Sequence, residues 1–417
     1  MQRRDFLAAL TAALAATRSR TLVAADGTPR KPRVLLRNAW QSINIGDIAH
    51  YLGLFELLQK HKIDVEIRFW AVNLENGADA LLARAFPHVV VIKGKDEIDA
   101  AFKECDFYIS GSGSGFPAWK DAMRWRTETG KPYGVLGVSL IGTEPRMIET
   151  LSKAEFAYFR DGHSLQVAKD KGCVCPIMDF GPDTAFGIVK LRNDDAATKF
   201  LKEHELEEGK FLVCIPRYRW TPQWTIKKDR PFEEAKHKRN EEMKEHDHAP
   251  HRAAIEAIVR KTDLKVLIVC EDQTQIQLGK ELLYDPLPED VKKRVVWRDR
   301  YWLTDEALST YVRSAGLFGN EMHSPIMCIA NGIPAVVCRF DEQTKKGLMW
   351  HDIGLDDWLF DLDKPDDVAR IAATVLKIAQ DPAAAKAYAA QGRDAMLKKQ
   401  QAEMDALTGA LKKSIHG

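Results

Sequence analysis

Residues 33–61, RVLLRNAWQSINIGDIAHYLGLFELLQKH, decide the fold class of this chain. RVLLRNA is a short apolar run that predicts a buried strand, and the residues after it place apolar side chains at helical spacing. The runs DVEIRFW, HVVVIK, DFYISG, PYGVLGVSL and CPIMDFG repeat this alternation. Strands that are apolar on both faces and joined by helices imply a parallel sheet covered on both sides. The first unit is therefore predicted to be Rossmann-like.

A second unit begins near Asn193 and repeats the pattern with KFLVCIP, KVLIVCE, RVVWRD, GLFGN and PAVVCR. We predict an α/β protein with an N-terminal Rossmann-like domain at 30–192 and a C-terminal one at 193–362. The carboxyl ends of both sets of strands are expected to face a central cleft. Residues 363–417 are rich in alanine and lysine and predict a helical C-terminal tail.

The composition excludes several classes of protein. The chain has 417 residues, 45% of them hydrophobic, which excludes a disordered chain. Its 61 lysines and arginines balance 60 acidic residues, so the net charge of +1 gives no field that would attract nucleic acid or an anionic membrane. No stretch is apolar for long enough to predict a transmembrane segment. We expect no nucleic-acid partner, and any ligand must be recognised locally.

The N-terminus predicts export. Residues 1–25 combine Arg3 and Arg4, then Phe6-Leu7, then a run of alanine and leucine. This order resembles a twin-arginine-type signal peptide cleaved near Ala25, which places the mature protein in the periplasm or outside the cell. The alternative is an N-terminal helix that stays on a cytoplasmic protein.

Two predicted strand ends carry features suited to an anion. In SINIGD, Asn44, Gly46 and Asp47 join a strand to a helix, and Gly46 allows a tight turn. The helix N-terminus offers free N–H groups to an anion. In FAYFRDGHS, Arg160 ends a strand, where it either contacts an anion or forms a structural ion pair with Asp183.

A third strand end is rich in glycine. Gly111, Ser112 and Gly113 follow DFYIS, and glycines allow the backbone to approach a ligand closely. The spacing without a suitably placed acidic partner does not indicate a dinucleotide site. A tight turn without a ligand is the alternative interpretation.

The stretch NEMHSPIMCIANGIP, residues 320–334, carries the strongest catalytic candidate. Ser324 and Pro325 predict the start of a helix. His323 therefore lies at a strand end over the cleft, where it is suited to donate or accept a proton. Glu321 stands two residues before it as a second catalytic candidate.

The stretch IPRYRWTPQW, residues 215–224, predicts contact with a carbohydrate. Aromatic rings stack on sugar faces, and arginines bind carboxylate or sulfate groups. The aromatic candidates are Tyr218, Trp220 and Trp224, and the cationic candidates are Arg217 and Arg219. The same residue types also pack domain interfaces. The charged insertion 227–251 predicts a solvated helix or a mobile loop, with a weak metal site at His246, His248 and His251 as the alternative.

Taken in order, these motifs resemble the polysaccharide pyruvyl transferase family. SINIGD is similar to the family's N-x-G-D opening, YFRDGHS to its R-D-x-x-S element, and GPDTAF to its D-x-A-F element. HSPIMCIANGIP is similar to its H-x-x-I-x-A-x-x-x-G-x-P segment, which has a lysine downstream. The resemblance implies a fold like the two-domain GT-B glycosyltransferases. It also implies transfer of a pyruvyl group from phosphoenolpyruvate to a sugar of a polysaccharide or oligosaccharide, without a further cofactor or metal.

Within that resemblance, His323 matches the histidine that faces the donor, and Arg160 falls on the R-D-x-x-S arginine. The family usually reads R-L-H where this chain reads Glu321-Met322-His323, so an anion replaces a cation. In one interpretation, Arg217 and Arg219 supply the lost charge and the protein is a transferase. In others, Glu321 and His323 form the acid/base pair of an exported hydrolase of ketal or glycosidic linkages, or the protein binds polysaccharide without catalysis. Export away from cytoplasmic phosphoenolpyruvate favours these latter interpretations.

Overall fold

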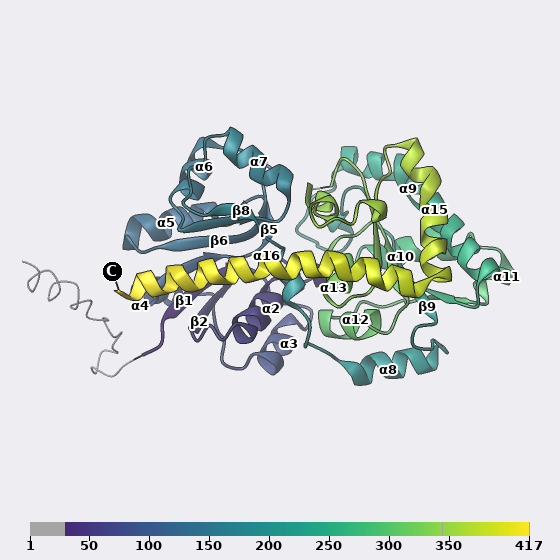
Figure 1. Cartoon of the computed structure of the whole chain (residues 1–417), viewed down its shortest axis with the longest axis horizontal. Coiled ribbons are helices and arrows are strands. Elements are labelled where there is room, and N and C mark those ends of the chain that lie inside the picture. Colours follow the sequence, from purple (N-terminus) through teal and green to yellow (C-terminus); the bar gives the residue numbers. More distant parts are fainter. Residues whose placement is uncertain (1–29, 344, 417) are drawn as a thin grey trace, which may run out of the picture.

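The computed structural model describes residues 30–343 and 345–416, which form two parallel sheets with helices on both faces (Figure 1). The first sheet has the order β3-β2-β1-β4-β6-β7-β8, with β5 paired to β6. Its strands are β1 (Arg33–Asn38), β2 (Glu66–Ala71), β3 (Val90–Ile92), β4 (Phe107–Ser110), β5 (Gly113–Ser114), β6 (Tyr133–Ser139), β7 (Phe156–Phe159) and β8 (Met178–Phe180). The helices between them are α2 (Ile45–Lys60), α3 (Ala78–Ala85), α4 (Lys95–Glu104), α5 (Trp119–Thr129), α6 (Pro145–Ser152) and α7 (Gly162–Asp170).

The second sheet has the order β11-β10-β9-β12-β13-β14. Its strands are β9 (Phe211–Ile215), β10 (Lys265–Ile268), β11 (Val295–Trp297), β12 (Gly316–Gly319), β13 (Ala335–Arg339) and β14 (Leu359–Asp361). The main helices are α8 (Asp194–Glu203), α9 (Glu234–Lys261), α10 (Gln275–Gly279), α11 (Glu289–Lys292), α12 (Thr304–Tyr311), α13 (His323–Ala330), α14 (Met349–Asp352), α15 (Pro365–Gln380) and α16 (Pro382–His416). Short helical turns are η1 (Thr184–Gly187), η2 (Gln223–Thr225), η3 (Lys280–Tyr284), η4 (Lys345–Leu348) and η5 (Asp356–Trp358).

The strands are parallel because apolar residues occupy both faces of each central strand. All five residues of β9 and all five of β13 are buried. A strand buried on both faces needs helices above and below it, which only crossover connections provide. The predicted α/β class with two Rossmann-like sheets is confirmed. The predicted domain limits of 30–192 and 193–362 remain predictions.

Helix α2 lies where the two sheets meet. It packs against η1 of the first unit and against α12 and α13 of the second. At Gly53 an added Cβ would lie 2.0 Å from the carbonyl oxygen of Thr184, so the glycine permits the close approach of α2 to η1. Burial on nearly every side explains why this helix reads as an almost continuous apolar run.

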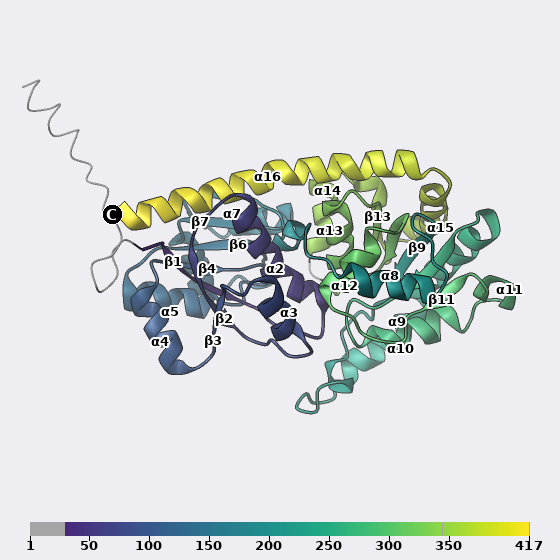
Figure 2. The ribbon, with the colours of Figure 1, turned by 90° about the horizontal axis from the view of Figure 1, so that it is seen from below.

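The predicted helical tail forms α15 and α16. Figures 1 and 2 show α16 leaving the second unit and running back along the first. On the first unit Lys60 donates to the Gln400 side chain at 3.0 Å, and the Tyr158 hydroxyl donates to the Ala402 carbonyl at 3.2 Å. The tail therefore joins the two units. In Figure 2 it lies on the side opposite the loop that precedes α9.

The charged insertion mostly becomes α9, whose second half is not solvated. His248 and His251 are both buried. Nε2 of His248 accepts the backbone N–H of Arg217 at 3.2 Å, and Nε2 of His251 bonds to the Asn320 side chain. The expectation of a wholly solvated segment is wrong around His248 and His251, because these histidines form hydrogen bonds with residues that follow β9 and β12. The predicted export signal lies outside the described residues, and none of the described helices combines the length and apolarity that crossing a membrane requires.

Candidate active site

A pocket of about 270 Å³ opens between the carboxyl ends of the two sheets. Loops after β1, β7, β9, β10 and β12 contribute to it, as the parallel topology requires. The charged and histidine side chains that line it are Asp47, His50, Arg160, Arg217, Asp272, His323 and Lys346. Trp40, Gln41, Asn44, Ser114, Pro117, Thr221 and Gln343 complete the lining. His323, Arg160 and Arg217 thus converge on one crevice, as the sequence predicts.

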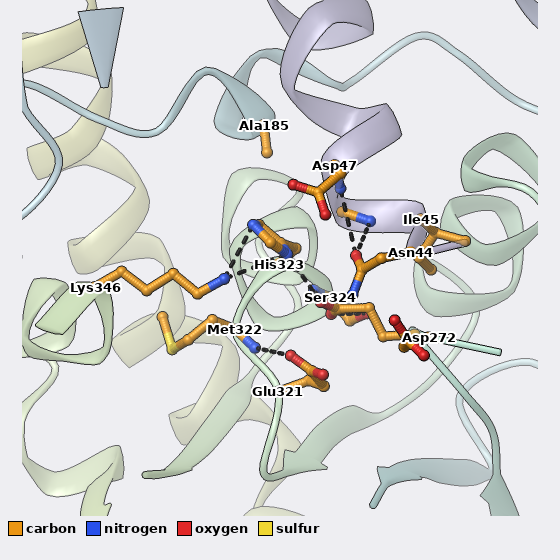
Figure 3. Close-up of polar contacts among 12 residues, drawn as sticks. Asn44, Ile45, Asp47, Ala185, Asp272, Glu321, Met322, His323, Ser324 and Lys346 are labelled. Atoms are coloured by element: carbon orange, nitrogen blue, oxygen red, sulfur yellow. Dashed lines mark hydrogen bonds and ion pairs between the residues drawn. The ribbon is translucent and has the colours of Figure 1, made fainter. Parts of the chain in front are cut away.

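His323 begins α13 and lies at the centre of the pocket (Figure 3). Its Nδ1 lies 2.9 Å from a carboxylate oxygen of Glu271, and the other oxygen of Glu271 accepts bonds from the N–H and hydroxyl of Ser324, both at 2.7 Å. A carboxylate accepts hydrogen bonds, so this contact places the proton on Nδ1 and leaves a lone pair on Nε2. Glu271 therefore fixes both the orientation and the tautomer of His323.

The Nε2 atom of His323 faces the pocket. Nζ of Lys346 lies 3.0 Å from it, and Nε2 of His50 lies 3.0 Å away on the other side. Burial, and then the charge of Lys346, hold the pKa of His323 well below its ordinary value. Burial also lowers the pKa of Lys346 to about 8. The imidazole is therefore neutral and keeps a lone pair on Nε2.

Arg160 forms the structural ion pair with Asp183 and also lines the pocket, while contact with an anion stays a prediction. Its Nη1 donates to Asp183 at 2.6 Å, and its Nε donates to the Ser139 hydroxyl at 3.0 Å. Asp183 also lies 3.2 Å from Nε2 of His50. Burial opposes ionisation of Asp183, but His50 and Arg160 outweigh it and hold the pKa of Asp183 well below its ordinary value. The ion pair forms, and the rest of the guanidinium lines the pocket.

Glu321 pairs with Arg217 and not with His323. Arg217 Nη1 donates to one oxygen of Glu321 at 2.7 Å, and Gln275 Nε2 donates to the other at 2.6 Å. Burial raises the pKa of Glu321, while the charge of Arg217 acts against this rise. Figure 3 shows the Glu321 carboxylate directed away from the imidazole. The carboxylate of Glu321 thus holds Arg217, and its catalytic role stays a prediction.

The N-terminus of α2 contributes differently from the prediction. The side-chain oxygen of Asn44 accepts the backbone N–H groups of Gly46 at 2.7 Å and Asp47 at 3.3 Å. These N–H groups are therefore capped and not offered to an anion. Asn44 and Asp47 line the pocket with their side chains, whereas Gly46 packs directly against His323.

The glycine-rich turn packs inside the first unit. An added Cβ at Gly111 would lie 2.0 Å from the Asn38 amide, and one at Gly113 would lie 2.7 Å from the indole nitrogen of Trp40. The Ser112 hydroxyl accepts the backbone N–H of Thr184 at 3.0 Å. These contacts use up the space that a ligand would need, so the interpretation as a tight turn fits, and the next residue, Ser114, lines the pocket instead.

Arg219 does not reach the pocket. It donates to both oxygens of Asp247 at 2.8 and 2.9 Å, and it pairs with Glu342 at 2.9 Å and Asp363 at 2.7 Å. Three carboxylates neutralise this guanidinium. It therefore cannot replace the positive charge of the arginine that the family usually has at the position of Glu321. Of the predicted sugar-binding aromatics, Trp220 and Trp224 line a larger groove beside the pocket, and Tyr218 lies outside both linings.

Three functional groups of the site are not among the sequence candidates, and a fourth, Lys346, is a lysine downstream in the family segment. His50 lies one helical turn after Asp47, and Glu271 and Asp272 follow the apolar run VLIVC. His50, Asp272 and Lys346 line the pocket, whereas Glu271 is buried and contacts His323. Burial raises the pKa of Asp272 to about 6. Strand-end position is the signal that marks Glu271 and Asp272, since carboxyl ends of parallel strands carry functional residues.

Asp47, His50 and His323 offer potential metal-ligand atoms within 4.8 Å of one another. Lys346 already contacts the His323 nitrogen that a metal would need. An ammonium group there repels a cation and attracts an anion. The arrangement therefore favours an anionic ligand over a metal ion.

Solved structures share this architecture at low sequence identity. UDP-GlcNAc 2-epimerase from Neisseria meningitidis bound to UDP-GlcNAc is 10% identical over 90% of this chain and 99% of that chain, with a TM-score of 0.57. S. aureus MnaA with UDP is 11% identical over 87% and 91%, with a TM-score of 0.53. Phytolacca americana UGT2 with UDP-2fluoro-glucose and pterostilbene is 12% identical over 91% and 99%, with a TM-score of 0.54. These similarities confirm the GT-B-like fold.

No curated protein matches the chain. A family model, polysaccharide pyruvyl transferase, matches residues 44–342. The match begins at the Asn44 cap of α2 and extends beyond His323, so it includes lining residues from both units, although Lys346 lies beyond it. The chain belongs to the polysaccharide pyruvyl transferase family.

Proposed function

We propose that this protein transfers a pyruvyl group from phosphoenolpyruvate to a sugar of a polysaccharide, forming a cyclic ketal and releasing phosphate. The observation that carries the proposal is the pocket itself. A neutral imidazole, His323, lies among three cationic side chains at the junction of two Rossmann-like units.

The three cations are suited to the donor's phosphate and carboxylate. Arg160, Arg217 and Lys346 all line the pocket, although Asp183 and Glu321 partly neutralise the two arginines. Opposite charges about 4 Å apart attract by roughly 4 kcal/mol at an effective dielectric constant of 20. Lys346 thus supplies the positive charge for which the sequence analysis offers Arg219.

The chemistry requires one proton acceptor and one proton donor. A sugar hydroxyl attacks the central carbon of phosphoenolpyruvate, whose methylene carbon takes up a proton to become a methyl group. A second hydroxyl of the same sugar then displaces phosphate, so two C–O bonds form and the bond to phosphate breaks. One hydroxyl proton ends on the methyl group and the other on phosphate.

The residues of the pocket match these roles. His323 accepts the hydroxyl proton through Nε2, because Glu271 holds the proton of the ring on Nδ1. Lys346, with its pKa lowered to about 8, is the proton donor nearest the imidazole and stabilises the departing phosphate. The separation of Glu321 from His323 does not favour the acid/base pair of a hydrolase.

The test is donor-dependent phosphate release by the purified protein with pyruvate-free polysaccharides, combined with detection of the ketal methyl group by NMR. His323→Ala and Lys346→Ala are each expected to lower the rate by roughly 100-fold or more. Lys199→Ala, on the exposed surface of α8, serves as the control. Full activity in His323→Ala would contradict the mechanism, and an absence of donor-dependent turnover with every polysaccharide would contradict the function.

A further inference from the structure

A second, larger cavity adjoins the pocket. This groove has a volume of about 970 Å³ and shares Arg217, Thr221 and Gln343 with the pocket. Leu140, Ile141 and His163 of the first unit form one side of it. Residues of the segment 217–236, residues 341–343 and Lys345 of the second unit form the rest. The groove therefore adjoins the pocket that contains His323.

Of the aromatic residues of the groove, Trp220 is exposed and Trp224 is half-buried. Asn240, buried in α9, accepts the Trp220 backbone N–H at 2.9 Å and donates to its carbonyl at 2.7 Å. The Trp224 ring packs edge-on against Phe232, with 5.6 Å between centroids. Fixed indole rings offer flat apolar surfaces at little cost in conformational entropy, which suits the apolar faces of sugar rings.

Large exposed hydrophobic residues gather around this groove. Trp220 is 36% exposed, Phe232 59% and Ile141 66%. Apolar side chains of this size on a rim of polar groups mark a binding surface. Figure 2 shows that the loop before α9 extends away from the body of the second unit.

The charges of the groove distinguish between classes of ligand. Arg219 pairs with Asp247, Lys236 with Glu233 at 2.6 Å, and Arg217 with Glu321. A nucleotide diphosphate needs cations that are not already neutralised. Paired side chains keep their capacity for hydrogen bonds to uncharged hydroxyl groups. Arg230 also lines the groove and forms no ion pair among the described residues, but the other arginines are paired, so the groove favours a hydroxyl-rich ligand over a diphosphate.

We infer that this groove binds several consecutive sugars of the acceptor chain, with Trp220 and Trp224 as stacking surfaces. The pocket has space for the donor and the reacting sugar, and a groove of this size at the upper end of the usual 300–1,000 Å³ range holds the neighbouring sugars. This inference rests on the proposed function and specifies its acceptor. The acceptor is an oligosaccharide segment and not a nucleotide sugar.

The test measures binding to the full-length protein without any donor. Tryptophan fluorescence and calorimetry would compare pyruvate-free bacterial mono- to hexasaccharides with UDP-glucose. Affinity is expected to rise with chain length. Trp220→Ala and Trp224→Ala should each weaken hexasaccharide binding about tenfold, and Trp220→Phe should retain most of it because the aromatic face remains. Trp119→Ala on α5, which lines neither cavity, is the matched control.

The outcomes separate the groove from the reaction. Equal binding by wild type and both Trp→Ala variants, or binding of UDP-glucose but of no oligosaccharide, would overturn the inference. Equal affinity for mono- and hexasaccharides would also overturn it. Thermal stabilisation by phosphoenolpyruvate is expected to be the same in the groove variants and the wild type. If phosphoenolpyruvate is neither bound nor consumed while oligosaccharides still bind through the tryptophans, the proposed reaction fails and the groove stands.

Discussion

Gly46 and His323 lie in direct contact across the two units: a β-carbon added to Gly46 would fall 2.0 Å from Nδ1 of His323. The missing side chain leaves the space in which the imidazole contacts Glu271. The glycine of SINIGD thus serves the packing of His323, and its backbone N–H is occupied by the Asn44 cap.

Gly46→Ala is therefore expected to displace the His323 ring. Overpacking of this kind costs about 1–3 kcal/mol of stability. The ring would also lose its alignment with Glu271. The free-energy loss calculated from kcat/KM should therefore exceed the loss in the free energy of unfolding. Melting temperature and kcat/KM for the donor would measure the two effects. Gly409→Ala in α16, where an added Cβ meets no atom within 4 Å, should leave activity unchanged. A fully active Gly46→Ala enzyme would contradict the contact.

Glu271→Gln is expected to lower kcat by roughly 100-fold with little change in KM. The amide keeps the shape of the carboxylate, but it no longer fixes the proton of His323 on Nδ1. Nitrogen NMR of the imidazole would show a changed tautomer ratio, which a purely structural role would not produce. Glu256→Gln, at a surface pair with Arg260, is the control. An unchanged tautomer ratio together with an unchanged kcat would refute the positioning role.

Glu321→Gln is expected to strengthen donor binding. Removal of the carboxylate frees the charge of Arg217, which lines the pocket. The KM for phosphoenolpyruvate should fall roughly tenfold, or about 1.4 kcal/mol. The variant should be less stable, because Arg217 loses a buried partner. Donor titrations and urea unfolding would measure both effects, with the surface variant Glu149→Gln as reference. A higher KM would show that Glu321 aids the donor site.

Acid is expected to destabilise the protein through His248 and His251. Burial lowers the pKa of each to about 4, whereas an unfolded histidine titrates near 6.5. The unfolded chain thus binds more protons, so this contribution is complete above about pH 6.5 and is lost as pH falls toward 4. It amounts to roughly 3 kcal/mol for each histidine. Protonation of His248 would also break its bond to the Arg217 N–H.

Urea unfolding at pH 7.5 and pH 5 would test this dependence. The double variant His248→Asn/His251→Asn should be less stable at neutral pH, because the bonds to Arg217 and Asn320 change. Its stability should vary less between the two pH values than that of the wild type. An equal pH dependence in both proteins would assign the acid sensitivity to other groups.

We propose that residues 1–25 direct export through the twin-arginine route. Replacement of both Arg3 and Arg4 with lysine should retain a fused reporter in the cytoplasm, because this route reads the paired arginines. Fractionation of cells expressing both forms would measure the effect. Equal distribution of the two forms would favour the alternative of an uncleaved N-terminal helix.

The sequence predicts the sheets well because their evidence is local. Runs such as VLIVC and AVVC carry their own burial pattern. AVVC lies within β13, and VLIVC begins within β10 and continues past its end. Strand ends then identify where Arg160 and His323 lie. The burial of His248 and His251 in α9 is not predicted, because both residues are polar and their partners, Arg217 and Asn320, are distant in the sequence.

The sequence by itself determined the two parallel sheets, the family and the position of His323, since periodicity and strand ends are properties of short segments. Only the tertiary structure decided which charges meet. Arg217 binds Glu321, Arg219 is neutralised by three carboxylates, and Lys346 reaches His323. Side-chain partners more than twenty residues apart depend on how the two units pack, and attraction between charges has no periodicity that a sequence displays.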